Sequence, residues 1–535
     1  MTADLTPTAR RLARAATLLA AATVASRGLG LIREVVAAAL FGASNARAAY
    51  VVAYSLPFFV QRLLLGGTLS IVFIPTITDY LNRGDREETA RVGALLFNLV
   101  LLVALAMVLA GEVLAPLLVR IAAPGFAAQA GLLTLAASLT RIIFLAMLFL
   151  ALSIFATGFL QAHQRFTAPA LAPLLFNVVV IAGTLWLGPR MGVAGLAVAW
   201  VLGTAVQFAV QLPAMRWAGF RYRPILSLGD PAVRTLMRLA GPAALGLAVL
   251  EINAYVARFF ASFLPPRPGV NAVAVLDYAY EVMQAPVGIF AISLATVVFP
   301  TLARQAAARD REGLRSSTAF GLRMTLVLIL PVVALLLALA PLVVRLIFER
   351  GEFTSGATAA VAGALRGYAA GLAGVALYAV ITRTFYAMQD MMTPLRIGAA
   401  MILLNILLTL GLMRAAGATG IALATSMVNL TSAALLLAGL RRRLGGLEGT
   451  RMLRTAARAG AAAALGGAAA AAVAGWGAGR MGTGVIEGAG LLAAGGGVGV
   501  LLFLAASWAL GVEEIRVLRD LLLRRLRAVP EARVV

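Results

Sequence analysis

The sequence predicts an all-α polytopic membrane protein, with about fourteen transmembrane helices in two parallel six-helix repeats plus two extra C-terminal helices. Three observations support this fold class. Hydrophobic residues make up 61% of the chain, and charged residues only 13%. Apolar runs long enough to cross a bilayer of about 30 Å recur from end to end. The chain also repeats itself at a fixed offset of 225 residues.

The repeat is clearest at residues 115–120, Ala-Pro-Leu-Leu-Val-Arg, which return at 340–345 as Ala-Pro-Leu-Val-Val-Arg. Further matches at the same offset are Arg33 with Arg258, Arg141 with Arg366, Pro75 with Pro300, Pro169 with Pro394, Gly192 with Gly417 and Gly195 with Gly420. Six predicted spans separate each residue from its partner. Because six is even, both copies cross the membrane in the same direction and form a parallel repeat. Paired halves of this kind commonly build a transporter with its site between them.

The individual spans are apolar runs of about 20 residues or more, separated by loops that carry Arg, Gly or Pro. In chain order the spans are 15–41, 48–78, 92–121, 131–160, 169–188, 192–214, 235–263, 272–302, 318–348, 357–388, 395–413, 418–440, 454–476 and 487–510. The first six spans form an N-lobe over residues 1–225, and the next six form a C-lobe over 226–447. The last two spans lie in 448–512, outside the duplication, and a basic tail occupies 513–535.

Arginine collects in every second loop. The arginines of these loops are Arg10, Arg11, Arg14, Arg83, Arg86, Arg91, Arg165, Arg216, Arg221, Arg223, Arg304, Arg309, Arg311, Arg315, Arg441, Arg442 and Arg443. Basic loops stay in the cytoplasm, so we expect both termini to be cytoplasmic. The first span also has features of a secretion signal. We interpret it as a retained span, because it runs on to Phe41 and contains Arg33, which has a repeat partner.

Composition excludes several functional classes. The net charge is +23, but the arginines lie between apolar spans and not on one soluble face, so we predict no nucleic-acid partner. The chain has no Cys and one His, His163, which argues against a metal site or a catalytic triad. It has no Lys, so it has no P-loop for ATP. We therefore predict a protein that is not an enzyme and holds no metal or cofactor. An ion gradient, the membrane potential or the substrate gradient would supply the energy.

Charged residues inside the predicted spans define a candidate site. A charge at the bilayer centre costs about 2.5–3.5 kcal/mol, so such residues usually face a wet cavity and pair with other groups. The candidate substrate-binding residues are Arg27, Arg33, Arg62 and Arg258, and the candidate acidic partners are Glu34, Glu251, Asp277 and Glu281. Their helical spacing predicts a cavity between the halves, lined by spans one, two, seven and eight. Several arginines in one cavity favour an anionic ligand, best of all a phosphate or diphosphate.

Other polar and helix-breaking residues have weaker interpretations. Arg120, Arg323, Arg345 and Arg383 lie near span ends and favour salt bridges or snorkelling, and the matched pair Arg141 and Arg366 favours packing. The candidate hinges are Pro57, Gly66, Gly67 and Pro286, for which close helix packing is an equal alternative. Asn405 and Thr409 share one face of a span and are a candidate monovalent-cation site, although packing is the stronger interpretation.

The chain resembles the MurJ/MviN lipid II flippases of the MOP exporter superfamily over nearly its full length. No single motif is decisive, but the order and spacing of several are specific. The matching segments are 26–34 (Ser-Arg-Gly-Leu-Gly-Leu-Ile-Arg-Glu), 35–43, 56–57, 73–75, 123–126, 165–170, 299–302, 348–354 (Phe-Glu-Arg-Gly-Glu-Phe-Thr), 385–390 and 393–394.

The resemblance implies a flippase of the bacterial cytoplasmic membrane that supplies peptidoglycan synthesis. Its substrate would be lipid II, an undecaprenyl-diphosphate disaccharide-pentapeptide, moved from the inner to the outer leaflet by alternating access. Arg27 and Arg33 carry over as the cavity arginines of span one, and Glu34 fills an acidic position. The polyprenyl tail would stay in lipid, along a groove that involves the last two spans. Membrane lipids and cell-wall synthesis proteins are the other implied partners.

The chain departs from the family pattern at five positions. Many members have an acid where this chain has Ala48, Gly66 or Gln284, and an arginine where it has Gln61 or Glu281. Glu281 thus reverses a charge in the expected cavity. The departures keep a second transporter function open, namely export of another polyprenyl-diphosphate glycan or amphiphile. A third alternative is a non-transporting scaffold for cell-wall enzymes, against which the costly intramembrane charges argue.

Overall fold

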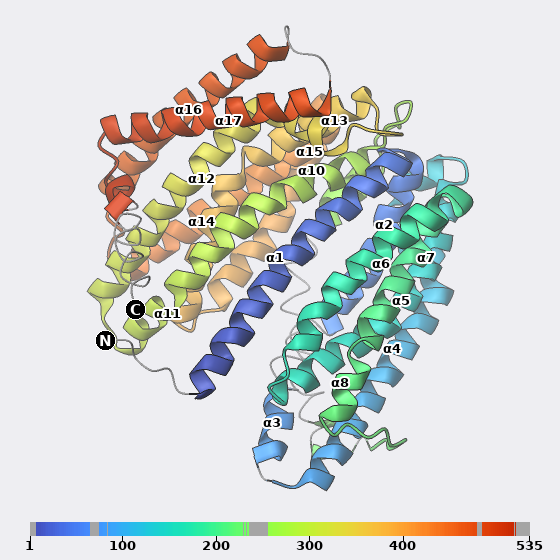
Figure 1. Ribbon diagram of the computed structural model, residues 1–535. Coiled ribbons are helices and arrows are strands. Elements are labelled where there is room, and N and C mark those ends of the chain that lie inside the picture. The colour runs from blue at the N-terminus through green and yellow to red at the C-terminus, as the bar shows by residue number, and fades with distance from the viewer. Residues whose placement is uncertain are drawn as a thin grey trace, which may run out of the picture. The chain divides into compact units, whose positions relative to one another are not determined.

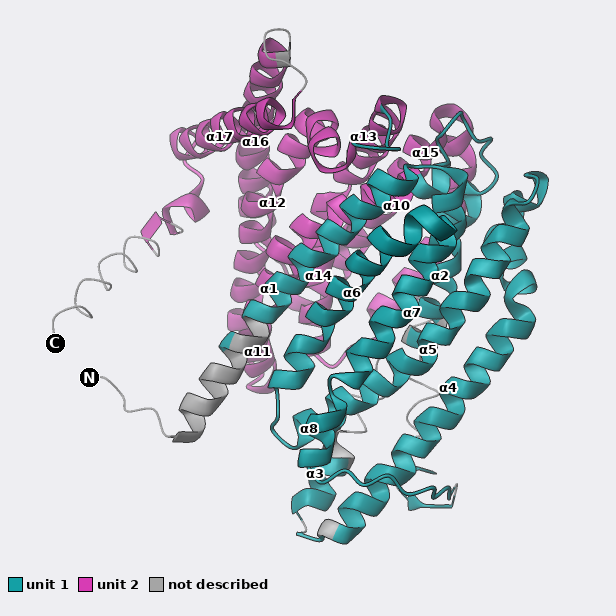
Figure 2. Ribbon diagram, turned by 45° about the vertical axis from the view of Figure 1, so that its right-hand side comes forward, with its two compact units in different colours: residues 1–274, 350–354 teal, residues 275–349, 355–535 magenta. Residues whose placement is uncertain are grey.

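A computed structural model describes residues 7–64, 74–82, 84–227, 229–231, 233–234, 255–478, 484–517 and 519–520. Almost every element among these residues is a helix, and no β-strand occurs in the described ranges. The predicted all-α fold class is therefore confirmed. The chain divides into two compact units, which Figure 2 colours separately.

Unit 1 comprises Met1–Ala274 and Arg350–Thr354. Its helices are α1 (Pro7–Phe41), α2 (Asn45–Leu64), α3 (Ile74–Asn82), α4 (Arg86–Ala122), the 3₁₀ turn η2 (Pro124–Ala128), α5 (Leu132–Ala162), α6 (Thr167–Met191), α7 (Val193–Ala209) and α8 (Leu212–Trp217). Residues 255–261 add a further short helical stretch. Within the unit α1 packs on α6, while α5 contacts α2, α4 and α7 (Figure 1).

Unit 2 comprises Val275–Glu349 and Ser355–Val535. Its helices are α10 (Ala272–Pro286, whose first turn belongs to unit 1), the π-helical turn η3 (Val287–Ile292), α11 (Ser293–Ala307), α12 (Arg311–Phe348), α13 (Ser355–Ala369), α14 (Leu372–Ala387), α15 (Met392–Leu444), α16 (Gly449–Ala478) and α17 (Val485–Ala509). Helix α12 contacts α13, α14 and the paired C-terminal helices α16 and α17, which lie side by side in both views.

The described residues contain nine helices that are long and apolar enough to cross a membrane, or ten if one bent pair counts as a single span. The predicted total of fourteen is not confirmed. Span 357–388 is divided into α13 and α14, which bend by 41°. Spans 395–413 and 418–440 run together as α15, with a break in the helical backbone at Gly417. The predicted lobe boundaries stay a prediction.

The internal repeat recurs in the backbone conformation. Gly192 has φ 60° and ψ −145°, and its partner Gly417 has φ 56° and ψ −132°. Side chains rarely adopt this region, so Gly is required at both positions. Three residues later, a Cβ added to Gly195 would lie 2.5 Å from the Leu187 main-chain oxygen, and one added to Gly420 would lie 2.0 Å from the Leu412 main-chain oxygen, before the break in α15. The same tight helix-to-helix turn is thus built once in each half.

Gly420→Ala is expected to destabilise unit 2, because its Cβ would overlap the Leu412 carbonyl oxygen and main-chain atoms must move apart. A loss of about 1–3 kcal/mol is typical of such overpacking. The matched control is Gly411→Ala in the same helix, where an added Cβ meets nothing within 4 Å. Thermal unfolding of the detergent-solubilised variants should lower the melting temperature for Gly420→Ala only. Equal melting temperatures would contradict the close approach.

The matched arginines Arg141 and Arg366 also have equivalent roles. The Arg141 Nε donates to the Glu112 main-chain oxygen at 3.1 Å, and the Arg366 Nε donates to the Leu337 main-chain oxygen at 3.0 Å. Both bonds join a helix to the helix before it, and both acceptors are themselves related by the 225-residue offset. This supports the packing interpretation of the pair.

Asp390 organises the connection between α14 and α15. Its carboxylate accepts hydrogen bonds from the main-chain N–H groups of Met392 and Thr393 and from the Thr393 hydroxyl, and it pairs with Arg443 at 2.5 Å. Burial by itself would raise the pKa of Asp390, but the hydrogen bonds from Thr393 and the charge of Arg443 outweigh it. The pKa therefore lies below its ordinary value of 3.8.

The lowered pKa of Asp390 predicts a pH-dependent contribution to stability. The folded chain favours the ionised carboxylate, so the stabilisation is complete above the ordinary pKa and disappears as the pH falls through the lower folded pKa. Asp390→Asn should lower the melting temperature at pH 7. The difference from wild type should shrink progressively below about pH 4. A difference that is independent of pH would contradict the assignment.

Candidate functional site

Two arginines share one buried carboxylate in unit 1. The Glu34 Oε1 atom of α1 accepts from Arg33 at 2.9 Å from Nη2 and 3.2 Å from Nε. Its second oxygen, Oε2, accepts from the Nη2 atom of Arg47 in α2 at 2.6 Å. Arg47 is 2% exposed and Glu34 is 7% exposed, so this ion pair is out of contact with bulk solvent. The three side chains carry a net charge of +1.

Arg33 is further positioned by α6 and α7. Its Nη1 atom donates to Asn177 Oδ1 at 3.2 Å, and its guanidinium lies 4.7 Å from the ring centroid of Trp200. Asn177 in turn donates to the Ser26 hydroxyl at 3.2 Å. Cation–π contact and forked hydrogen bonding suit the planar, delocalised guanidinium of arginine and not the ammonium of lysine. Arg33 is consequently held in one orientation by three different helices.

Aromatic side chains surround this cluster. Tyr54 stacks on Trp200 with ring centroids 6.0 Å apart and planes inclined by 17°. Tyr50 lies edge-on to Trp200 at 6.3 Å, and the Arg47 guanidinium lies 5.3 Å from the Tyr50 ring. Aromatic faces attract cations, so they offset part of the cost of burying two guanidinium groups.

Sequence reasoning missed Arg47. The second span was predicted to begin at residue 48, which placed Arg47 in a loop. In the structure α2 begins at Asn45 and carries Arg47 in its first turn, next to α1. The sequence signal was a lone arginine in a short turn that is otherwise poor in charge. Its partner, Glu34, lies 13 residues earlier, on the other side of the turn, so no helical spacing related the two.

The other predicted arginines of this site are placed differently. Arg27 is exposed on α1, about two helical turns before the buried Glu34. Arg258 is partly buried, with its guanidinium 5.4 Å from the Tyr255 ring. The backbone of Arg62 lies in α2, but its side chain is outside the described part of the chain. The substrate-binding roles of these residues and of Arg33 stay predictions.

Of the predicted acidic residues of spans seven and eight, the structure describes Asp277 and Glu281. Asp277 is buried on α10, at 4% exposure, whereas Glu281 is exposed one turn later. Glu251 lies outside the described residues. Asp277 and Glu281 belong to unit 2, while Arg27, Arg33 and Arg258 belong to unit 1. The predicted cavity between the halves remains a prediction.

One hinge candidate coincides with an irregular backbone. Pro286 ends α10 and is followed by the π-helical turn η3, after which α11 continues. π-helical turns are rare in proteins, and those that occur are frequently found at functional sites. Pro57 is buried within α2, and Gly66 and Gly67 lie outside the described residues. The hinge roles stay predictions.

The cation-site candidates Asn405 and Thr409 are both buried in α15, at 1% and 0% exposure. The Thr409 hydroxyl donates to Asn405 Oδ1 at 3.2 Å, which confirms that the two side chains share a helix face. Their predicted role in binding a monovalent cation remains a prediction.

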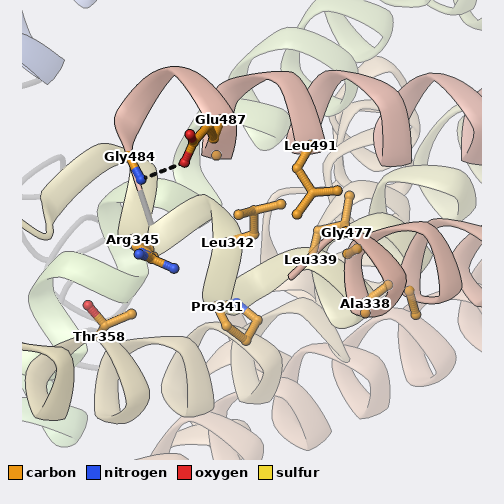
Figure 3. Close-up of a pocket in the computed structure, with 14 residues that line it drawn as sticks. Ala338, Leu339, Pro341, Leu342, Arg345, Thr358, Gly477, Gly484, Glu487 and Leu491 are labelled. Atoms are coloured by element: carbon orange, nitrogen blue, oxygen red, sulfur yellow. Dashed lines mark hydrogen bonds between the residues drawn. The ribbon is translucent and has the colours of Figure 1, made fainter. Parts of the chain in front are cut away.

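A pocket of about 330 Å³ lies between α12, α13, α16 and α17 in unit 2 (Figure 3). Leu339, Leu342 and Leu491 form apolar walls, and the charged side chains of Arg345 and Glu487 line it as well. Glu487 accepts a hydrogen bond from the Gly484 main-chain N–H at 3.1 Å. The other lining residues that α16 and α17 contribute are small: Ala471, Ala474, Gly475, Gly477 and Gly488. The pocket therefore combines apolar walls with two charged groups.

Comparison with known proteins identifies the family. A family model described as "Lipid II flippase MurJ" matches residues 37–484. A Vibrio cholerae protein named "Probable lipid II flippase MurJ" is 32% identical over 443 residues, which cover 81% of this chain and 83% of that protein. A Burkholderia cenocepacia protein named "Lipid II flippase MurJ" is 30% identical over 429 residues, covering 79% and 82%.

Solved structures agree on the fold. A structure titled "Lipid II flippase MurJ, inward closed conformation" has a TM-score of 0.75 and 24% identity, covering 95% of this chain and all of that chain. An inward-facing MATE family transporter of the MOP superfamily has a TM-score of 0.65 and 17% identity, covering 79% and 95%. At these identities the likeness concerns the fold. From the family match and the relatives together, the chain belongs to the lipid II flippase MurJ family.

Proposed function

We propose that this chain is a flippase that moves lipid II from the inner to the outer leaflet of the cytoplasmic membrane. Family membership and the names of the relatives support the substrate class. The observation that carries the proposal is the cluster of Arg33, Glu34 and Arg47 inside unit 1, with its net positive charge. An enzyme is disfavoured, because the sequence has no Cys and a single His that caps a helix.

The chemistry of the cluster suits the diphosphate of lipid II. A guanidinium can form two parallel hydrogen bonds to phosphate oxygens, and these charge-assisted bonds are short and strong. Arg33 is 17% exposed at its side chain, so it is the member of the cluster that a ligand can reach. Arg27 is exposed on the same helix and would add a second positive charge. Such charges are costly in a membrane and are usually retained for function.

Transport would proceed by alternating access, with bending at Pro57 and at Pro286, beside the π-helical turn. No ATP-binding loop is present in the sequence, so the membrane potential or a monovalent ion would supply the energy. The buried pair Asn405 and Thr409 is the candidate site for that ion. The apolar walls of the pocket between α12, α16 and α17 would accommodate part of the polyprenyl tail.

We infer that the protein lies in the cytoplasmic membrane with both termini in the cytoplasm, because arginine collects in every second loop. Its partners would then be lipid II, membrane lipids and cell-wall synthesis proteins.

The test is complementation. The full chain is expressed in a bacterium depleted of its own lipid II flippase, and growth and the exposure of lipid II at the outer surface are both scored. Rescue with exposed lipid II is expected. A stable, membrane-inserted protein that gives neither growth nor exposed lipid II would refute the proposed substrate.

A second candidate function is export of another polyprenyl-diphosphate glycan. It is favoured by the exposed acid Glu281 on α10, where many family members carry an arginine. Surface exposure of a different lipid-linked glycan, without lipid II, would support it. A scaffold without transport activity is disfavoured, because a scaffold gains nothing from the buried Arg47–Glu34 ion pair.

A further inference from the structure

Arg47 has a position that helix stability does not explain. It is the third residue of α2, where the helix dipole disfavours a positive charge. It is also 2% exposed, so its burial removes a guanidinium from water. A compensating group is Glu34 of the preceding helix, at 2.6 Å. The cost of burying Arg47 is thus offset in part by Glu34, a carboxylate that also contacts Arg33.

The two arginines are not equivalent partners of Glu34. Arg47 makes the shorter contact and is almost completely buried, while Arg33 makes contacts of 2.9 and 3.2 Å and is 17% exposed. Each arginine uses a different carboxylate oxygen, so one can leave without displacing the other. Arg47 is thus the permanent partner of Glu34, and Arg33 is the partner that can exchange the carboxylate for an incoming anion.

We propose that Arg47 is a positioning residue that neutralises Glu34 and so leaves Arg33 with a net positive charge for a diphosphate group. This inference rests on the proposed function. Without Arg47, the Glu34 carboxylate would neutralise Arg33 and repel the anion, and in a low-dielectric interior such effects are large. Arg47 does not touch the ligand. It acts through the charge of Glu34, and the Tyr50 ring at 5.3 Å helps to hold its guanidinium in place.

The test is a double-mutant cycle on the purified full-length chain in detergent, with undecaprenyl diphosphate as the titrated probe and undecaprenol as the uncharged control. Arg47→Met should raise the dissociation constant for the diphosphate at least about tenfold, as expected when Glu34 neutralises Arg33 and the charge-assisted interaction of Arg33 with the diphosphate is lost. It should leave undecaprenol binding unchanged. Adding Glu34→Gln to Arg47→Met should restore the diphosphate affinity to within about threefold of wild type.

Three further variants separate positioning from structural damage. Arg47→Lys keeps the charge and should bind the diphosphate almost as wild type does. Glu34→Gln alone should bind the diphosphate at least as tightly as wild type does. This measurement tests the role of the Glu34 charge even if the Arg47→Met variant does not fold. Arg190→Met, an exposed arginine on α6, is the matched control and should change nothing. A double variant as weak as Arg47→Met, or weaker diphosphate binding by Glu34→Gln, would overturn the inference.

The inference and the proposed function fail in different ways. If wild type binds undecaprenyl diphosphate and the cycle behaves as expected, yet complementation fails, the lipid II assignment is wrong and the role of Arg47 stands. If complementation succeeds but Arg47→Met binds the diphosphate as wild type does, the role of Arg47 is wrong and the flippase assignment stands.

Discussion

Arg33→Ala is expected to abolish growth of a bacterium that depends on this chain as its lipid II flippase, without loss of the folded protein. Removing Arg33 deletes the accessible guanidinium that would bind the diphosphate. Glu34 keeps Arg47 as a partner at 2.6 Å, so the change leaves no unpaired buried charge. Protein levels in the membrane should therefore stay near those of wild type.

The measurement is growth after depletion, together with immunoblotting of membranes and assay of lipid II at the outer surface. Arg27→Ala should give the same loss, because Arg27 contributes the exposed charge on α1. The control is Arg190→Ala, an exposed arginine that donates to the Trp186 main-chain oxygen of its own helix. Normal growth of both Arg27→Ala and Arg33→Ala would remove these arginines from the transport mechanism.

Arg323→Met is expected to cause a large loss of stability in unit 2. Arg323 of α12 is 8% exposed and pairs with Glu514 at 2.7 Å and with Glu448 at 2.5 Å. Glu514 is also within 3.5 Å of the Thr455 hydroxyl. The substitution would leave the buried Glu514 carboxylate without its arginine, and breaking a buried ion pair in this way costs about 3–5 kcal/mol. The N-terminal end of α16 should detach from α12, and so should the residues around Glu514 that follow α17.

Thermal unfolding in detergent should show a fall of at least about 5 °C for Arg323→Met, with earlier proteolysis after residue 448. Adding Glu514→Gln should recover most of the loss, because the buried carboxylate is then replaced by a neutral amide. Arg451→Met is the exposed control. Its contacts to Glu448 and Glu513 are longer, at 3.6 and 3.8 Å, so it should cost at most about 1 kcal/mol. Similar losses for Arg323→Met and Arg451→Met would contradict the buried network.

Local properties of the fold followed from the sequence. The 225-residue offset predicted that the two halves repeat, and the turns at Gly192 and Gly417 have matching backbone angles. The span-end interpretation of Arg323 as an ion-pair residue is confirmed, although its two partners were not predicted. The ends of helices were harder to predict from the sequence, because hydropathy does not report where an apolar helix bends. The break at Gly417 inside α15 illustrates this limit.

The candidate site was predicted only in part. Arg33 and Glu34 were recognised because charge within an apolar span is costly and therefore informative. Arg47 was missed because it stands at the first turn of its helix, where hydropathy treats it as a loop residue. Trp200 and Asn177, which hold Arg33, are far away in sequence and have no motif that connects them to it.

The sequence by itself determined the membrane class, the internal repeat and the concentration of costly charges on the first span, because all three follow from composition and spacing along one chain. Only the tertiary structure decided that Glu34 is shared between Arg33 and Arg47, and that Arg323 joins α12 to residues 448 and 514. The physical reason is that an ion pair depends on which helices pack together. That packing is a collective property of many apolar side chains, and no spacing within a single helix encodes it.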